Sequence, residues 1–163
     1  MDYELVVPYI PNLRRYARAL AGDRHAADDL VQDTLERAVR KFHLWRPGDL
    51  RAWLFSIMHN VFVNQIKARK ITSSAEVDEN FVGATTPGWV TDVLDLERGL
   101  AGIPAEQREV VLMVSLEDMS YEEVSRALGV PIGTVMSRLS RGREKLRAYM
   151  DGESSRSNLK VVR

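Results

Sequence analysis

Apolar residues at helical spacing constrain the fold of this chain more than any other feature. Tyr9, Leu13, Tyr16 and Leu20 recur at intervals of four, three and four residues, which places them on one face of a helix. The same period returns from Val93 onward, and no stretch alternates polar and apolar residues as a half-buried strand would. The pattern predicts an all-α fold.

A segment without any period separates the two helical blocks. Residues 72–91 are rich in Ser, Thr, Gly and acidic side chains and contain no basic residue, a composition typical of a linker. We therefore expect two small helical domains, formed by residues 1–71 and 92–150 and joined by a flexible linker. Residues 151–163 follow the last apolar repeat, and we expect them to form a frayed or disordered tail.

Residues that begin and end helices mark the element boundaries of the first domain. Gly22 suits the left-handed end of a first helix, and Asp23 is placed to cap the N-terminus of the second. Asp49 follows a Pro-Gly turn and is placed to cap a third, long helix that runs from Leu50 to about Lys70. The first domain is therefore predicted to contain three helices.

The composition excludes several classes of protein. No apolar run approaches the roughly 20 residues that a bilayer crossing needs, so we expect no membrane insertion. The N-terminus lacks the pattern of a secretion signal, because Pro8 and Pro11 interrupt its apolar residues. The chain has no cysteine, which excludes a disulfide framework, a thiolate zinc site and thiol catalysis. These features suit a protein of the reducing cytoplasm.

Charge is segregated along the chain, although 23 basic and 23 acidic residues cancel overall. Residues 1–71 carry a net charge of +4, residues 92–137 carry −6, and residues 138–147 return to +4. A basic patch confined to one short segment can meet phosphates locally, but few contacts give weak, salt-sensitive binding. We therefore expect nucleic-acid binding that depends on help from a partner.

The best-specified helix start lies in the second domain. Ser120 and Glu123 form the sequence pattern of a capping box, and apolar neighbours are placed to pack beside it as a hydrophobic staple. Gly129 ends this short helix, and a last helix follows to about Met150. Helix, glycine turn and helix in this order predict a helix-turn-helix, whose second helix enters the major groove of DNA.

The last predicted helix separates an apolar face from a polar one. Val135 and Leu139 point to the core, and four polar residues spaced at i, i+3, i+4 and i+7 lie about 120° away. Arginine side chains in such positions can read guanine through two hydrogen bonds, whereas a solvated basic helix at a domain end is the plainer interpretation. The four residues of this face are Thr134, Ser137, Arg138 and Arg141.

Three stretches of the chain resemble a known family. Residues 119–147 are similar to region 4.2 of bacterial sigma factors, in particular of the extracytoplasmic-function (ECF) group of the sigma-70 family. Residues 27–42 resemble sigma region 2.2, and residues 50–67 resemble regions 2.3 and 2.4. The resemblance covers residues 5–70 and 93–148 and leaves no room for regions 1.1 and 3, which implies the minimal type with a region 2 bundle and a region 4 helix-turn-helix.

The resemblance implies a non-enzymatic specificity subunit of RNA polymerase that directs transcription initiation. In the family, region 2.2 docks on the clamp helices of the polymerase β′ subunit, and the matching polar stripe comprises Asp29, Gln32 and Asp33. Regions 2.3 and 2.4 open and read the minus-10 element, and region 4.2 reads the minus-35 element. The residues implied for the minus-10 element are Asn60, Asn64 and Lys67, and those for the minus-35 element are Thr134, Ser137, Arg138 and Arg141.

The partners implied by the resemblance are the RNA polymerase core, through its β′ and β subunits, promoter DNA, and an anti-sigma factor that would cover the same surfaces. Because each DNA-reading surface is small, both would have to be held on one polymerase to bind well. The resemblance implies no cofactor and no metal ion.

Two other classes of protein remain open on the residues alone. A stand-alone helix-turn-helix repressor would dimerise through its N-terminal helices and bind a palindrome tightly without polymerase. A metal-dependent hydrolase would use the acidic cluster of Asp28, Asp29 and Asp33, with Glu36 and His25 on or near the same helix face. Exposed carboxylates without clustered histidines seldom form a catalytic metal site, so this second alternative is the weaker.

The third predicted helix is apolar over an unusually wide arc. Trp53 is expected in the core, while Phe55 and Phe62 could serve either the core or an unstacked base. No second histidine lies at helical spacing from His59, so we expect a surface or capping side chain and not a metal ligand.

Overall fold

The computed structural model describes the backbone of residues 2–72 and 88–161 and the side chains of residues 3–69 and 95–152. Every regular element in these ranges is helical, which confirms the predicted all-α class. None of the described helices is long and apolar enough to span a membrane. In chain order the elements are the 3-10 turns η1 (Asp2–Leu5) and η2 (Val7–Tyr9), α1 (Ile10–Ala21), α2 (Arg24–Lys41), η3 (Phe42–Leu44), α3 (Leu50–Thr72), α4 (Gly88–Gly102), α5 (Ala105–Ser115), α6 (Tyr121–Leu128) and α7 (Ile132–Val161).

The helix boundaries of the first half follow the predicted capping residues. Gly22 ends α1 in the left-handed region at φ 71°, where its N–H donates to the Arg18 carbonyl at 3.1 Å. The Asp23 carboxylate accepts hydrogen bonds at 3.3 Å from the N–H groups of His25 and Ala26 at the start of α2. Asp49 accepts from the Ala52 N–H at 3.0 Å and caps α3 in the same way. Local side-chain chemistry therefore sets these three boundaries.

The helix-turn-helix of the second half has the predicted boundaries as well. The Ser120 hydroxyl accepts from the Glu123 N–H at 3.1 Å, and the Glu123 carboxylate accepts from the Ser120 N–H at 3.3 Å, which completes the capping box. Gly129 ends α6 at φ 67° and allows the sharp turn into α7. The short α6 is thus specified at both ends.

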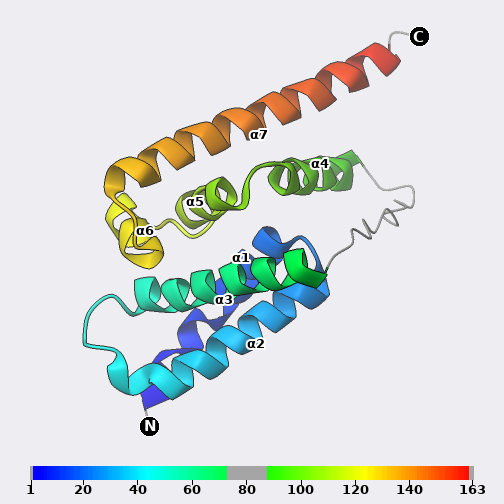
Figure 1. The fold of residues 1–163 in the computed structure, drawn as a ribbon. Helices are drawn as coiled ribbons and strands as arrows, with labels where there is room; N and C mark the ends of the chain where they lie inside the picture. The colour runs from blue at the N-terminus through cyan, green and yellow to red at the C-terminus, as the bar shows by residue number, and fades with distance from the viewer. Residues whose placement is uncertain (1, 73–87, 162–163) are drawn as a thin grey trace.

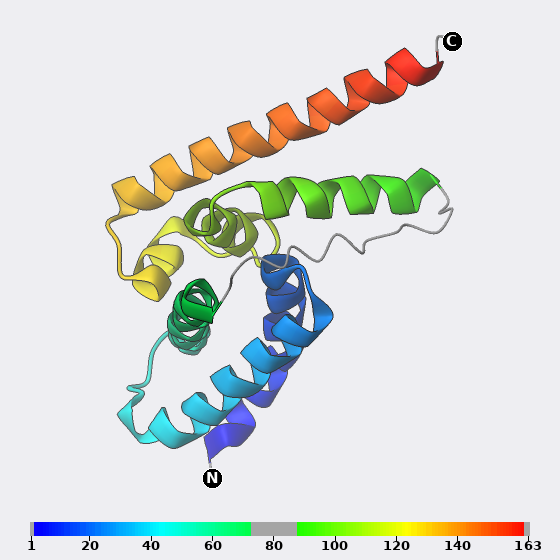
Figure 2. The same ribbon diagram turned by 45° about the vertical axis from the view of Figure 1, so that its right-hand side comes forward.

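The seven α-helices of residues 2–72 and 88–161 form two groups that pack against each other. Helices α1, α2 and α3 lie together on one side of the molecule, and α4 to α7 lie on the other, with α7 running along α4 and α5 (Figures 1 and 2). Contacts of α3 with α6, and of α1 with α4 and α5, join the groups. The two predicted domains therefore sit side by side with an extensive interface.

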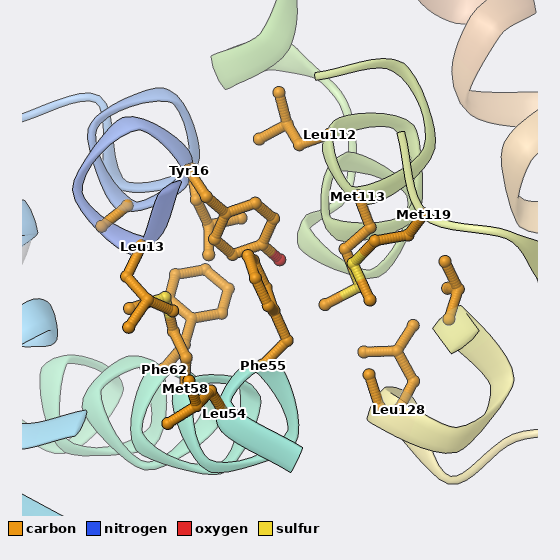
Figure 3. Packing of buried hydrophobic residues seen from close by; sticks show 14 of the residues in the cluster. Leu13, Tyr16, Leu54, Phe55, Met58, Phe62, Leu112, Met113, Met119 and Leu128 are labelled. Carbon is orange, nitrogen blue, oxygen red and sulfur yellow. The ribbon is translucent and has the colours of Figure 1, made fainter. Parts of the chain in front are cut away.

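One apolar core runs through both halves of the molecule. Tyr16 of α1 and Phe55 of α3 meet edge to face, with ring centroids 4.9 Å apart, and both side chains are fully buried. Figure 3 shows these rings facing a cluster from the second half that includes Met113 and Met119. Burial of this apolar surface favours the packed arrangement of the two groups.

The structure corrects two boundaries at the ends of the predicted linker and tail. Helix α7 continues to Val161, so the prediction that residues 151–163 are frayed or disordered is wrong for residues 151–161. No proline interrupts this stretch, and a single Gly152 costs only about 1 kcal/mol relative to alanine, too little to end a helix. Helix α4 begins at Gly88, inside the predicted linker 72–91, of which residues 73–87 lie outside the described residues.

Helix α7 approaches α5 closely at Gly142, which generates a prediction about stability. A Cβ atom at Gly142 would lie 2.7 Å from Cγ2 of Val111 and 3.3 Å from Cβ of Gln107. We expect Gly142→Ala to lower the free energy of unfolding by about 1–2 kcal/mol, because overpacking outweighs the gain in helix propensity. Urea unfolding measures this quantity.

Gly152→Ala is the matched control, because Gly152 lies in the same helix and a Cβ there would meet no atom within 4 Å. We expect this variant to be as stable as the wild-type chain or slightly more stable. Equal stability of Gly142→Ala and the wild type would contradict the close approach of α5 and α7.

Candidate nucleic-acid interface

Helix α2 presents the predicted polar stripe to solvent. Asp29, Gln32 and Asp33 are all exposed, while Leu30 and Thr34 on the other side are fully buried. The buried Thr34 hydroxyl donates to the Leu30 carbonyl at 2.6 Å, so it needs no other partner. Within the described side chains, no ion pair engages either aspartate of the stripe. The stripe is therefore free to meet another molecule.

Helix α3 places its three predicted polar residues on an exposed edge. Asn60, Asn64 and Lys67 are exposed, so amide groups and one cation are available along about two turns of helix. Phe55 and Phe62 are buried, which assigns both rings to the core. Polar and core residues of α3 are thus separated by face even though the helix is apolar over a wide arc.

An aromatic hollow that the sequence reasoning missed lies at the start of α3. It has a volume of about 380 Å³, and Trp53, expected in the core, is half-buried in its wall. The Phe42 ring stands 5.3 Å from that of Trp45 and 6.0 Å from that of Trp53, measured between centroids. The feature of the sequence that could have predicted this hollow is the group of aromatic residues Phe42, Trp45 and Trp53 on either side of a Pro-Gly turn. The lining residues are Leu44, Trp45, Arg46, Asp49, Ala52, Trp53, Ser56 and Arg126.

Helix α7 separates its two faces as predicted. Val135 and Leu139 are buried, while Ser137 and Arg141 are exposed. Arg138 is less accessible than expected, because its side chain is 24% exposed and forms an ion pair with Glu106 of α5 at 3.8 Å; Thr134 is also half-buried. The face is a polar and basic surface on which one of the two arginines already has a partner.

Charged residues of the first half pair with charged residues of the second half, and no sequence prediction included these contacts. The Arg15 guanidinium donates to both carboxylate oxygens of Glu117 at 2.7 and 3.0 Å. Arg51 donates to Glu123 at 2.6 and 2.9 Å and to the Glu117 carbonyl at 3.3 Å. We call four contacts the interdomain pairs: Arg15–Glu117, Arg51–Glu123, His59–Glu109 and Asp49–Arg126.

The most deeply buried interdomain pair joins α3 to α5. His59 Nδ1 lies 2.7 Å from the Glu109 carboxylate, whose side chain is 3% exposed. Burial raises the pKa of Glu109, and the hydrogen bond and charge of His59 oppose this shift, as does the charge of Arg138. His59 was expected to be a surface or capping residue, and it is instead a half-buried partner of a buried carboxylate.

Burial of two further polar groups at the interface between the halves is energetically unfavourable. The Tyr16 hydroxyl is fully buried without a hydrogen-bond partner among the described residues, and burial raises its pKa well above the ordinary value. Arg108 of α5 donates to the carbonyls of Leu20, Leu100 and Ile103 at 2.7 to 3.1 Å, and burial lowers its pKa. Arg108 thereby satisfies carbonyl groups of both halves.

The structure does not favour a metal site. Among the described residues, no three His, Asp or Glu side chains gather closely enough to hold a metal ion. The acidic residues of α2 are exposed, and no hydrogen bond or ion pair of the described residues joins one of them to a histidine. The metal-dependent hydrolase therefore gains no support from the geometry.

Two family models match the chain. The model for the "Sigma2 domain of PhyR" matches residues 6–59, and the model for "Sigma-70, region 4" matches residues 94–146. The first match includes α1, α2 and the first ten residues of α3. The second includes α5, α6 and the first half of α7.

Curated relatives are similar over most of the chain. The ECF RNA polymerase sigma factor SigE of Mycolicibacterium smegmatis is 35% identical over 93% of this chain, which spans 62% of that relative. The ECF RNA polymerase sigma factor EcfG of Rhodopseudomonas palustris is 34% identical over 90% of this chain and 84% of the relative. Among solved structures, the sigma factor RpoE of Bartonella quintana in complex with the anti-sigma factor NepR aligns with a TM-score of 0.76 and 32% identity, covering 91% of this chain and 95% of RpoE.

The buried pair of His59 and Glu109 generates a prediction about pH. Because folding raises the pKa of Glu109, the folded protein binds this proton more tightly than the unfolded chain does. The contribution of Glu109 to stability therefore rises as the pH falls through its folded-state pKa and levels off below the ordinary value of 4.5. Urea unfolding across this range should show the wild type gaining stability relative to Glu109→Gln as the pH falls.

Asp49→Asn is the control variant, because the stability difference from the wild type should change with pH in the opposite direction. Burial acts to raise the pKa of Asp49, but the hydrogen bonds from Ala52 and Arg126 lower it overall. The wild type should therefore lose its advantage over Asp49→Asn as the pH falls through the ordinary value of 3.8. If the stability difference between the wild type and Glu109→Gln is constant with pH, the burial of Glu109 is not as described.

Proposed function

The chain belongs to the ECF group of RNA polymerase sigma factors of the sigma-70 family, and from this premise we propose that it binds core RNA polymerase and directs initiation at promoters with minus-10 and minus-35 elements. One observation carries the proposal: three exposed polar surfaces, on α2, α3 and α7, stand on the helices that resemble the polymerase-binding and DNA-reading regions of the family. Run-off transcription with purified sigma-free core polymerase and a promoter pool tests it directly.

The polar stripe of α2 is proposed to dock on the β′ clamp helices. Asp29 and Asp33 supply negative charge and Gln32 supplies an amide, a combination that suits a basic partner surface. All three side chains are exposed and lie within the matched sigma2 segment. Complementary charge of this kind raises the association rate and fixes the orientation of the complex.

The exposed edge of α3 is proposed to read the minus-10 element. The amides of Asn60 and Asn64 can form hydrogen bonds with base edges of an unpaired strand, and Lys67 can hold its backbone. These residues lie beyond the sigma2 match, which ends at residue 59. The assignment is therefore supported by their exposure and chemistry and not by the family match. The neighbouring aromatic hollow is large enough to take a planar base, and stacking on Trp45 or Trp53 would stabilise it.

The polar face of α7 is proposed to read the minus-35 element in the major groove. Arg141 and Ser137 are exposed there, and Arg138 becomes available when its ion pair with Glu106 breaks. Thr134 lies in the first turn of α7, at the beginning of this face. Few cations contact the duplex, so the isolated chain should bind promoters weakly and gain affinity when polymerase holds both surfaces.

An anti-sigma factor is proposed as the regulator of this chain, as NepR is the partner of the related RpoE. A groove of about 710 Å³ between α1 and the pair α4 and α5 supports this proposal. Leu96, Leu100 and Leu112 supply apolar surface in it, and Arg14 and Arg18 stand along one side. An amphipathic helix with acidic residues at one edge has the chemistry to fill such a groove.

Removal of the stripe's charge should weaken polymerase binding. We expect Asp33→Ala to lower the affinity for core polymerase at least about fivefold, about 1 kcal/mol, while the fold stays intact because the side chain is exposed. Asp28→Ala removes the same charge from the same helix outside the stripe and should bind normally. Fluorescence anisotropy with labelled chain measures both, and equal affinity of the two variants would count against the docking assignment.

Loss of a base-reading arginine should relax specificity at one promoter position. We expect Arg138→Ala to cost about 1–3 kcal/mol at a single minus-35 position, because a base contact carries sequence information. Arg143→Ala, exposed on another side of α7, should instead weaken all sequences evenly or have no effect. A promoter library transcribed with each variant separates the outcomes, and an even loss with Arg138→Ala would reassign that residue to phosphate binding.

A further inference from the structure

We infer that Met136 of α7 determines specificity by packing against the C5-methyl group of one thymine of the minus-35 element. Met136 is 52% exposed on a helix that is proposed to enter the major groove. The inference rests on the proposed promoter function and adds to it an apolar base contact, which the four residues of the predicted polar face do not include.

The exposed side of α7 is displaced from the predicted polar face. Thr134 and Arg138, at one edge of that face, are half-buried. Met136 and Ser140, beyond its other edge, are exposed. Because successive residues of a helix are about 100° apart, Met136 lies next to the exposed Ser137 around the helix. A duplex that approaches the open side of α7 therefore meets Met136 together with Ser137.

Met136 belongs to an apolar strip on this exposed side. Ile132, one turn earlier in α7, is 40% exposed, and residues four apart on a helix are neighbours on its surface. Tyr121 at the start of α6 is 37% exposed and lines, together with Met136, a hollow of about 420 Å³. Apolar surface gains free energy when it leaves water, so a group of exposed apolar residues on a helix-turn-helix indicates a surface that a partner covers.

Cations beside the apolar strip indicate that this partner is DNA. Arg143 and Arg147 line the same hollow and outnumber its acidic residue, Glu144, so the hollow is positively charged overall. No ion pair among the described residues engages either arginine. Cations next to an apolar strip match the major groove, in which rows of phosphates border the edges of the bases.

The C5-methyl group of thymine is the apolar group that the major groove offers to such a side chain. The other groups at the base edges are hydrogen-bond donors and acceptors, and a thioether is at most a weak acceptor. Met136 therefore favours thymine in two ways: it packs against the methyl group, and it leaves the polar edge of any other base without a partner. Its unbranched and flexible side chain can adapt to the position of the methyl group.

The position of Met136 along α7 suits a base contact, whereas the two arginines suit phosphate contacts. The N-terminal residues of a recognition helix contact base edges, and Met136 lies in the second turn of α7, which begins at Ile132. Arg143 and Arg147 lie about 10 and 16 Å further along the helix axis, at a rise of about 1.5 Å per residue. In this assignment Arg143→Ala weakens binding to all sequences evenly, because phosphate contacts carry no sequence information.

A thymine analogue without the methyl group tests the inference. Deoxyuridine keeps the O4 acceptor and the base pairing of thymine and lacks only the C5-methyl group. In a promoter selected by run-off transcription, each minus-35 thymine of either strand is replaced in turn, and competition against the unmodified promoter measures the affinity of the complex of core polymerase with this chain. We expect a loss of about three- to fivefold at one position, the effect of exposing roughly one buried methyl group.

Met136→Ala removes the side chain that is proposed to contact the methyl group. We expect this variant to bind the thymine and deoxyuridine promoters equally at that position, so that the two changes are coupled and not additive. Met136 is exposed, so the variant should fold. Val39→Ala is the matched control, because Val39 is 55% exposed on α2 and its loss should leave the full three- to fivefold preference for thymine. Arg143→Ala should weaken binding to both promoters by the same factor.

Two results would overturn the inference and leave the proposed function intact. The first is a wild-type chain that selects promoters but tolerates deoxyuridine at every minus-35 position, or a Met136→Ala chain with unchanged sensitivity to it. The second is a Met136→Ala chain that binds core polymerase less tightly and keeps the base preferences of the wild type, because Met136 would then face a protein. If the wild type yields no promoter-specific transcript at all, the proposed function itself fails, and the thymine contact fails with it.

Discussion

The arrangement of this molecule depends on the pairing of buried carboxylates in its second half with basic side chains of its first half. Glu117 and Glu109 have side chains that are 1% and 3% exposed, and a charge at such depth needs a partner. Arg15 of α1 and His59 of α3 provide these partners and so align two helices of one group with α5 and the loop before α6. The apolar core makes contact between the halves favourable, whereas the pairs decide which residues meet.

Local features of the sequence account for the helices and for the faces that carry the candidate surfaces. Gly22, Asp23, Ser120 and Gly129 act on groups within a few residues of themselves, so their effect can be derived without the rest of the fold. The exposed stripe of α2 and the polar face of α7 follow in the same way from helical period alone. The end of α7 did not follow, because after Met150 neither a glycine cap nor a proline forces a stop, and propensity alone gives only a weak preference.

The interdomain pairs could not be predicted because they join residues 50 to 102 positions apart. The sequence shows that residues 1–71 carry a net charge of +4 and residues 92–137 a net charge of −6, but it does not show which charged side chains contact each other. His59 illustrates the difficulty: helical period places it near the polar strip, and only the packing of α5 turns that position into the partner of a buried glutamate. The ion pair between Arg138 and Glu106 could not be predicted for the same reason, because it depends on how α5 packs against α7.

Two groups at the interface between the halves oppose its formation, so the interface is specific without being as stable as its area would allow. The buried Tyr16 hydroxyl has no partner among the described residues, and the Glu109 carboxylate has its pKa raised by burial, so both lose hydration when the halves pack together. Separation of the halves would return both groups to water, and it would leave Arg15, Arg51 and their carboxylates solvated, where ion pairs contribute little. A wholly apolar interface of the same area would hold the halves together more tightly and would offer no such compensation on separation.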